Sequence, residues 1–245
     1  MRVNAPVCNP GMCVLLVSIA AACGSAQNSD VSAKTPESAQ ATASDSQPGW
    51  TVLFDGSGTT AWRGFKKTDL PSGWQVVDGA LTRVGLGGDI ITRDQFGDFE
   101  LELEWKLAPK GNSGIMFRVT EADSNTYRTG PEMQVLDDAG HQDGKNRLTS
   151  AGSNYALHAA LAGVVKPVGE WNQVRLVVRG AHVEHWLNGQ KVVEYELWSP
   201  DWEAKVKASK FVEWPGYGRA KRGHIALQDH GDWVAYRNIR IRELK

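Results

Sequence analysis

The clearest pattern in the chain is a strict alternation of apolar and charged residues between positions 99 and 107. This segment reads FELELEWKL, so every second residue is apolar and the residues between them are Glu or Lys. Successive side chains of a β-strand point to opposite faces of its sheet. The pattern therefore predicts a strand with one buried face and one solvated face.

Shorter apolar segments of the same kind recur from Trp50 to the end of the chain. Turn signals separate them, and the strongest are the hairpin dipeptides Asn188-Gly189 and Asp78-Gly79. No long stretch has a convincing helical period. We therefore expect an all-β fold, an antiparallel jelly-roll sandwich of two sheets. Besides 99–107, the predicted strands are 51–54, 74–77, 80–84, 89–92, 114–119, 132–137, 173–179, 182–187, 191–196, 224–228 and 234–242.

Two long connections interrupt the strands, at residues 138–170 and 197–222. The second carries Trp198, Trp202 and Trp214. Long loops in a compact domain are often functional, and aromatic side chains in them can stack on sugar rings. The alternative is that these aromatic residues simply hold the loop against the sandwich.

The N-terminus predicts export. Residues 12–22 form a short apolar stretch ending in small residues before Cys23, which is typical of a signal peptide (1–22) followed by a lipidated cysteine. Residues 23–48 are polar and read as a tether, and 49–245 as the folded domain. We expect a lipoprotein of the cell envelope, in the periplasm or on the outer membrane, held to the membrane by its lipid alone. The alternative is an ordinary signal peptide with an incidental Cys23.

Charge and cysteine content exclude several classes of protein. Lys and Arg number 27 against 28 Asp and Glu, so no basic field favours nucleic acid. All three cysteines precede residue 24. The folded part therefore has no disulfide, no thiolate nucleophile and no cysteine-bound zinc.

The segment EMQVLD at 132–137 is the most suggestive for chemistry. Met133 and Val135 should face the core, so Glu132 and Gln134 share the solvated face. Asp137 falls on the core side unless a bulge returns it to the face of Glu132. The pattern resembles the E-x-D-x-x-E strand of laminarinase-type glucanases. However, the Cα atoms of residues 132 and 137 would lie roughly 16 Å apart on an extended strand, far for a retaining carboxylate pair.

Further polar side chains are predicted on the same face. Arg118 should point away from the core, opposite Ile115 and Phe117, and so should Gln228 and His230. Each could be an ordinary polar residue of a sheet surface. Together with Glu132 and Gln134 they favour a carbohydrate site.

Metal-ligand chemistry is also present, without a diagnostic spacing. Asp137, Asp138, His141 and Asp143 are close in sequence. We predict no organic cofactor and leave a divalent metal open.

Several segments together resemble the bacterial 3-keto-disaccharide hydrolase family. They are "LFDGSGTTAWRGF", "FELELEW", "NSGIMFR", "PEMQVLDDAGH", "GEWNQVRLVVRG" and "IALQDHGDWVAYRNIRIREL". The resemblance implies a concanavalin-A-like jelly roll, export and action on 3-keto-glycosides. It implies sites around the residues already named and Tyr155. We expect catalytic roles for Glu132, Asp137, His230 and Arg118, and substrate contacts from Gln134, Gln228, Tyr155, Asn112 and His141.

The implied substrate suggests a mechanism. A ketone at C3 acidifies the C2 proton, so a base can form an enolate that expels the C1 oxygen, and water then adds. His230 or Glu132 would be the base, and the other, or Asp137, the acid. Arg118, or a metal, would hold the enolate oxygen. No G-x-G-x-x-G motif opens a helix, so a separate oxidoreductase must make the ketone. The competing hypotheses for the function are a non-catalytic carbohydrate-binding module, a structural envelope domain and a glucanase-like glycosidase that uses Glu132 and Asp137.

Overall fold

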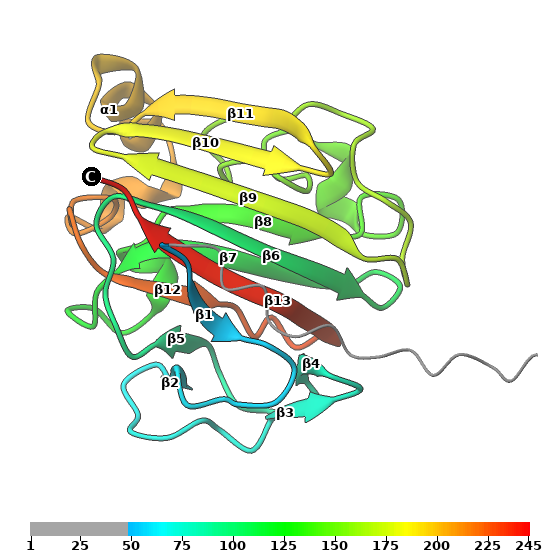
Figure 1. Ribbon diagram of the computed structural model, residues 1–245. Coiled ribbons are helices and arrows are strands. Elements are labelled where there is room, and N and C mark those ends of the chain that lie inside the picture. The colour runs from blue at the N-terminus through cyan, green and yellow to red at the C-terminus, as the bar shows by residue number, and fades with distance from the viewer. Residues whose placement is uncertain (1–48) are drawn as a thin grey trace, which may run out of the picture. The chain divides into compact units, whose positions relative to one another are not determined.

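Two antiparallel β-sheets packed face to face make up the part of the chain that the computed structural model describes, residues 49–245 (Figure 1). The predicted signal peptide, Cys23 and the tether lie outside the described residues. The larger sheet has the order β11-β10-β9-β6-β13-β4-β3, with β1 also paired to β13, and the smaller has the order β2-β5-β12-β7-β8. The jelly-roll sandwich expected from the sequence is confirmed.

The strands of the larger sheet are β1 (Thr51–Phe54), β3 (Trp74–Val77), β4 (Ala80–Arg83), β6 (Phe99–Leu107), β9 (Asn172–Arg179), β10 (His182–Leu187), β11 (Gln190–Glu196) and β13 (Val234–Glu243). The smaller sheet contains β2 (Trp62–Gly64), β5 (Ile90–Thr92), β7 (Asn112–Val119), β8 (Glu132–Leu136) and β12 (His224–Leu227). One α-helix, α1 (Pro200–Lys207), and the 3₁₀ turns η1 (Thr126–Arg128), η2 (Gln142–Lys145) and η3 (Lys210–Glu213) complete the described elements.

The alternating strand β6 shows why the sheets pack. Its apolar side chains are buried between the sheets, and its glutamates face outward. Arginines on the neighbouring strand β13 pair with these glutamates. Arg240 donates to Glu102 at 2.6 Å, and Arg237 donates to Glu104 at 2.6 Å. The row of like charges is therefore compensated across the sheet, as such a row requires.

All twelve predicted strands are present, and most of their ends agree within a residue or two. At the predicted hairpin, Asn188 and Gly189 both have positive φ, 49° and 81°, as a two-residue turn of type I′ requires. Strand β2 went unpredicted because three residues are too few to show a period.

The expectation that 197–222 is only a loop was wrong, because it contains α1. Ser199 caps this helix by accepting a hydrogen bond from the backbone N–H of Trp202 at 3.2 Å. Pro200 occupies its first turn, where its missing N–H costs nothing. Trp202 is fully buried and stacks between Tyr195 and Tyr217, with ring centroids 5.6 and 5.9 Å away. For Trp202, then, the alternative reading holds: it fixes the segment to the sandwich.

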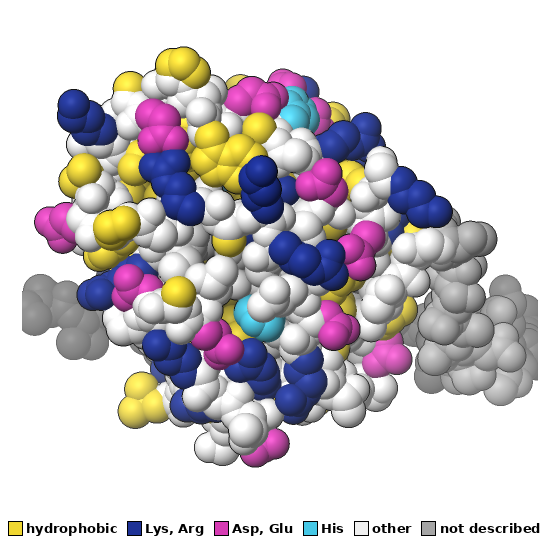
Figure 2. All heavy atoms as spheres, turned by 90° about the vertical axis from the view of Figure 1, so that its left-hand side faces the viewer, with side chains coloured by type: hydrophobic (Ala, Val, Ile, Leu, Met, Phe, Trp, Pro, Cys, Tyr) yellow, Lys and Arg dark blue, Asp and Glu magenta, His cyan; other side chains and the backbone are white. Residues whose placement is uncertain are grey.

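Surface charge on the described part is mixed. In Figure 2, Lys and Arg side chains are interspersed with Asp and Glu over the face shown. No helix in residues 49–245 combines the length and apolar character needed to cross a bilayer.

Candidate functional site

A row of residues crosses four strands of the smaller sheet on the face turned away from the core. The strand registers align Asp89 at the start of β5, Gln228 at the end of β12, Gly114 in β7 and Gln134 in β8. The backbone N–H of Gln228 donates to the carbonyl oxygen of Gly114 at 3.0 Å. Three polar side chains are thus brought to one surface from segments far apart in the sequence.

The carboxyl group of Glu132 lies over Gly114 in the middle of this row. A Cβ atom added to Gly114 would come within 2.0 Å of the Glu132 Oε1 atom. Glu132 starts β8, one pleat from Gln134, and its side chain leans into the space that the glycine leaves. The predicted sharing of one face by Glu132 and Gln134 is what the structure shows.

Apolar neighbours surround Glu132. The next row of the same face carries Ile91, Ala226 and Met116, which are fully buried and are covered by Phe65 and Tyr127. Glu132 itself is only 7% exposed. This burial raises the pKa of the Glu132 carboxyl to about 8; the charge of Lys210 acts to lower that pKa and the charge of Asp89 to raise it. A carboxyl held protonated at neutral pH is typical of an acid–base catalyst.

Asp89 is a member of the site that sequence reasoning missed. Its carboxylate accepts hydrogen bonds from the Thr126 hydroxyl and from the backbone N–H of Asp229, the latter at 2.8 Å. Burial raises the pKa of Asp89 above its ordinary value. The available signal was an aspartate directly before the apolar strand IIT, but only the register shows that it faces outward.

The two glutamines differ in how their side chains are satisfied. The amide nitrogen of Gln134 donates to the carbonyl oxygen of Thr149 at 3.3 Å. The side-chain oxygen of Gln228 is buried and has no hydrogen-bond partner within residues 49–245. Buried polar atoms are normally paired, so this oxygen is suited to accept a hydrogen bond from a ligand.

Three residues form the rim of the site. Tyr155 donates its backbone N–H to the carbonyl oxygen of Glu132 at 3.0 Å. The ammonium group of Lys210 lies 4.6 Å from the centroid of the Tyr155 ring. His230 is half exposed, and its positive charge would lower the pKa of Asp89, so it belongs to the same neighbourhood.

The predicted outward direction of Arg118 was wrong. Arg118 has a left-handed backbone, with φ 51°, where the pairing of β7 with β12 shifts register. Its buried guanidinium donates to the carbonyl oxygens of Gly97 and Gly180, at 3.1 and 2.9 Å, and to Asp98 at 3.0 Å. The irregularity inverts the alternation, so the next residue, Val119, lies on the outer face.

Asp137 and His141 are engaged in a turn after β8. The Asp137 carboxylate accepts backbone N–H bonds from Lys110, Ala139 and Gly140 at 2.8, 3.2 and 3.0 Å. The Nδ1 atom of His141 accepts the backbone N–H of Asp143 at 3.1 Å. The structure does not bring either side chain into the row with Glu132.

Asn112 lies on the same face as Gly114, one pleat away, and is buried. Its side-chain oxygen has no partner among the described residues. Its backbone N–H donates to Asp232 at 3.1 Å. Asn112 therefore stays a candidate for a substrate contact.

A convergence of metal-ligand atoms occurs elsewhere in the described part of the chain. One atom each from His182, Glu184 and Glu194, on β10 and β11 of the larger sheet, lie within 4.8 Å of one another. Lys191 pairs with both glutamates, and Glu196 accepts from His182 at 2.6 Å, so the lysine and the histidine offset part of the charge of these carboxylates. The question of a divalent metal in the candidate site, which the sequence leaves open, is not tested by the described residues.

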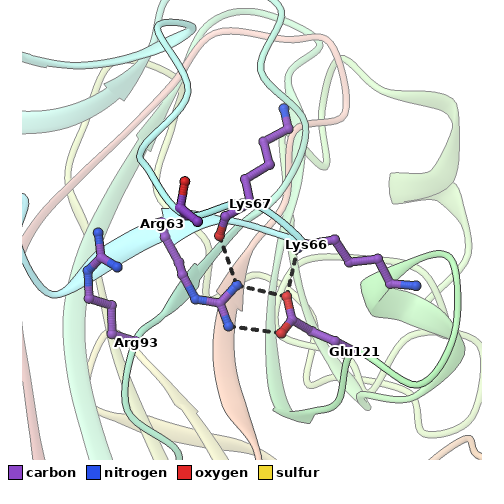
Figure 3. A pocket seen from close by; sticks show the side chains of 6 residues that line it. Arg63, Lys66, Lys67, Arg93 and Glu121 are labelled. Atoms are coloured by element: carbon purple, nitrogen blue, oxygen red, sulfur yellow. Dashed lines mark hydrogen bonds and ion pairs between the residues drawn. The ribbon is translucent and has the colours of Figure 1, made fainter.

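A pocket of about 610 Å³ opens beside edge strand β2, and it is distinct from the row (Figure 3). It is lined by Arg63, Lys66, Lys67, Thr68, Arg93 and Glu121. Arg63 donates two hydrogen bonds to Glu121, at 2.7 and 2.9 Å, and the Lys66 backbone N–H donates a third at 2.7 Å. The Arg63 bond is the main cause that lowers the pKa of Glu121 to about 2. This carboxylate is a fixed structural anion.

Comparison with known proteins identifies the site's context. Residues 49–242 match the sequence profile of the 3-keto-α-glucoside-1,2-lyase-like domain. The chain belongs to this family. A 3-keto-disaccharide hydrolase of Bacteroides thetaiotaomicron is 36% identical over 228 residues, which cover 80% of this chain and 79% of that protein.

Solved structures agree with this assignment to the lyase-like family. A candidate glycosyl hydrolase from Parabacteroides distasonis is 34% identical and superposes with a TM-score of 0.75, covering 80% of this chain and 94% of its own. A second from the same organism is 29% identical, with a TM-score of 0.62 over 80% and 99% of the two chains. The family resemblance that the sequence indicates is confirmed, and the chain is an enzyme that acts on sugars.

Proposed function

We propose that this protein cleaves 3-keto-disaccharides and related 3-keto-glycosides by elimination, with Glu132 as the base. The observation that carries the proposal is the buried Glu132 carboxyl, whose pKa is raised to about 8 over Gly114 in the outer face of the smaller sheet. The named relative, a 3-keto-disaccharide hydrolase, supports the substrate class.

The reaction requires one strong carboxylate base. The ionised Glu132 takes the C2 proton, and the electron pair of that C–H bond forms the C2–C3 double bond while the C3 oxygen becomes negative. The C3 carbonyl then re-forms, and the electron pair of the C2–C3 double bond moves to form a C1–C2 double bond. The C1–O bond breaks in the same step. The leaving oxygen takes a proton, which we assign to His230 on the rim. Water adds across C1–C2, with hydroxyl to C1 and a proton to C2, so the net reaction is hydrolysis.

The raised pKa of Glu132 suits this role. A base is stronger when its conjugate acid has a higher pKa, and at pH 7 roughly a tenth of a group with a pKa of about 8 is ionised. The rate should therefore increase with pH up to about pH 8. An ordinary carboxylate would be fully ionised at pH 7 but a much weaker base toward carbon.

The remaining polar groups are suited to hold the sugar. The free oxygen of Gln228 and that of Asn112 can each accept a hydroxyl hydrogen bond. Gln134 and Tyr155 stand on either side of Glu132 along β8 and its edge. Because Asp137 is held by backbone N–H groups, a glucanase-like pair of Glu132 and Asp137 finds no support.

The proposal also covers the source of the ketone and the location of the protein in the cell. The ketone must be supplied by a separate oxidoreductase, because the sequence has no dinucleotide-binding glycine motif. We also propose that the chain works in the cell envelope, anchored through a lipid on Cys23. Fractionation of cells that express the Cys23→Ser variant would test the anchor.

The elimination route is tested in heavy water. With a 3-keto-glucoside, the wild type should place deuterium at C2 of the released 3-keto sugar, and it should leave the unoxidised glucoside intact. Glu132→Gln should lower kcat by about 10²-fold or more, since acid–base catalysis commonly contributes that much. Efficient cleavage of the parent glucoside, or product without deuterium at C2, would rule out the elimination.

A further inference from the structure

The enolate oxygen of this reaction needs a positive partner, and Arg118 does not reach the site. The developing charge on the C3 oxygen would cost several kcal/mol in a buried site without such a partner. A neighbouring arginine, Arg83, is engaged with Asp229 at 2.7 Å. The cation that acts on Glu132 is Lys210, from the segment 197–222.

The position of Lys210 follows from two contacts. Its ammonium group rests 4.6 Å from the centre of the Tyr155 ring, and Tyr155 is bonded through its backbone to Glu132 at 3.0 Å. The amino-aromatic contact holds the ammonium group at Tyr155, whose backbone lies next to that of Glu132.

The backbone of Lys210 is held firmly. Ser209 caps the turn η3 by accepting the N–H of Phe211 at 3.2 Å. The next side chain, Phe211, is buried and stacks on Tyr217 with ring centroids 3.9 Å apart. The lysine therefore projects from a fixed base, although its own side chain is exposed.

We propose that Lys210 stabilises the enolate oxygen formed when Glu132 removes the C2 proton. This inference rests on the proposed function. The C3 oxygen is separated from the C2 proton by two bonded carbon atoms, so a base within hydrogen-bond reach of C2 brings that oxygen within about 5 Å of its own carboxyl. The charge of Lys210 acts on the Glu132 carboxyl, and its ammonium group is held over Tyr155, the neighbour of Glu132 at the sheet edge, so it is placed to meet that oxygen. The same charge keeps Glu132 more readily ionised, which a base requires.

Lys210→Met tests the proposal, because methionine keeps the apolar stem and removes only the charge. We expect kcat on a 3-keto-glucoside to drop by about 10²-fold with little change in KM, since the lost interaction is made mainly in the transition state. The pKa of Glu132 should increase without the nearby cation, so the rising limb of the kcat/KM profile should move to higher pH. Lys210→Arg should restore part of the activity. Lys207→Met, at the exposed end of α1, is the matched control and should behave as the wild type.

The outcomes separate the two proposals. A wild type that fails to cleave any 3-keto-glucoside would overturn the proposed function and this inference with it. An active wild type whose Lys210→Met variant keeps its kcat and pH profile would overturn the role of Lys210 alone. An increase in KM at unchanged kcat would also overturn it, because it would show that Lys210 only binds substrate. Melting curves of the variants show whether a loss of activity comes from unfolding.

Discussion

At the scale of single residues, the glycine beneath Glu132 matters as much as the acid itself. Gly114 has an ordinary backbone conformation, so a β-carbon would be tolerated by the main chain. The three atoms nearest to where that carbon would lie all belong to the Glu132 side chain, and its Oε1 atom, 2.0 Å away, excludes the carbon. The glycine is therefore required by the position of a side chain on another strand.

Gly114→Ala should displace the Glu132 carboxyl and lower kcat by about 10²-fold, because a misplacement of about 1 Å can have that effect. We expect the variant to remain folded, since the acid can swing outward toward the rim. Steady-state kinetics and a melting curve provide the measurement. Gly58→Ala, where nothing lies within 4 Å of the new carbon, is the control. An alanine variant with wild-type kcat would show that Glu132 acts from another position.

At the scale of elements, strand β7 contributes one residue to the candidate site, Gly114, and one residue that holds neighbouring loops together, Arg118. Its regular half presents Gly114 outward, and its irregular end turns Arg118 toward the loops around Gly97 and Gly180. The guanidinium is 2% exposed and joins three segments of the chain. Arg118 thus belongs to the stability of the sandwich.

Arg118→Ala should reduce the free energy of unfolding by about 2–4 kcal/mol, because three hydrogen bonds of a buried charge are lost and their acceptors are left behind. The kcat of the folded fraction should stay near that of the wild type. Urea unfolding, with kinetics well below the melting temperature, would measure both quantities. Normal stability with a hundredfold loss of kcat would return Arg118 to the role that its sequence position suggested.

The same strand shows how far sequence reasoning reaches. The apolar period correctly assigned Glu132, Gln134 and Gln228 to one face, because their strands are regular around these positions. Arg118 was misplaced because a one-residue irregularity reverses every side chain beyond it, and no residue type announces the irregularity. Asp89 and Lys210 could not be assigned to the site from the sequence. The strand register brings Asp89 to Glu132, and the path of the long segment 197–222 brings Lys210 there.

At the scale of the whole molecule, two buried titratable groups shape stability against pH. The pKa of Glu132 is raised to about 8 in the folded chain, so between about pH 4.5 and 8 this carboxyl ionises in the unfolded chain before it ionises in the folded chain. The free energy of unfolding therefore decreases as the pH increases across this range. Burial lowers the pKa of His185 to about 4. Stability is therefore also lost as the pH decreases from about 6.5 to 4.

Glu132→Gln should remove the decrease in the free energy of unfolding that the wild type shows as the pH increases from about 4.5 to 8. The variant and the wild type should melt alike near pH 4.5, and the variant should be more stable at pH 8.5 by on the order of 2–4 kcal/mol, since one pKa unit corresponds to about 1.4 kcal/mol. Unfolding curves across this range provide the measurement, with the exposed Glu170→Gln as control. Equal curves for variant and wild type at pH 8.5 would contradict the burial of an unpaired carboxyl.

The segment that carries Tyr155 also affects whether separate copies of the protein associate through their sheet edges. Strand β8 ends the smaller sheet, and an open strand edge is a template for pairing between chains. Here that edge is occupied: Gln134 donates its backbone N–H to Ser153 at 3.0 Å and accepts that of Gly152 at 2.8 Å, and Tyr155 continues the contact. The stretch that shapes the rim thus also protects against aggregation, so a variant trimmed there to admit bulkier sugars would expose an adhesive edge.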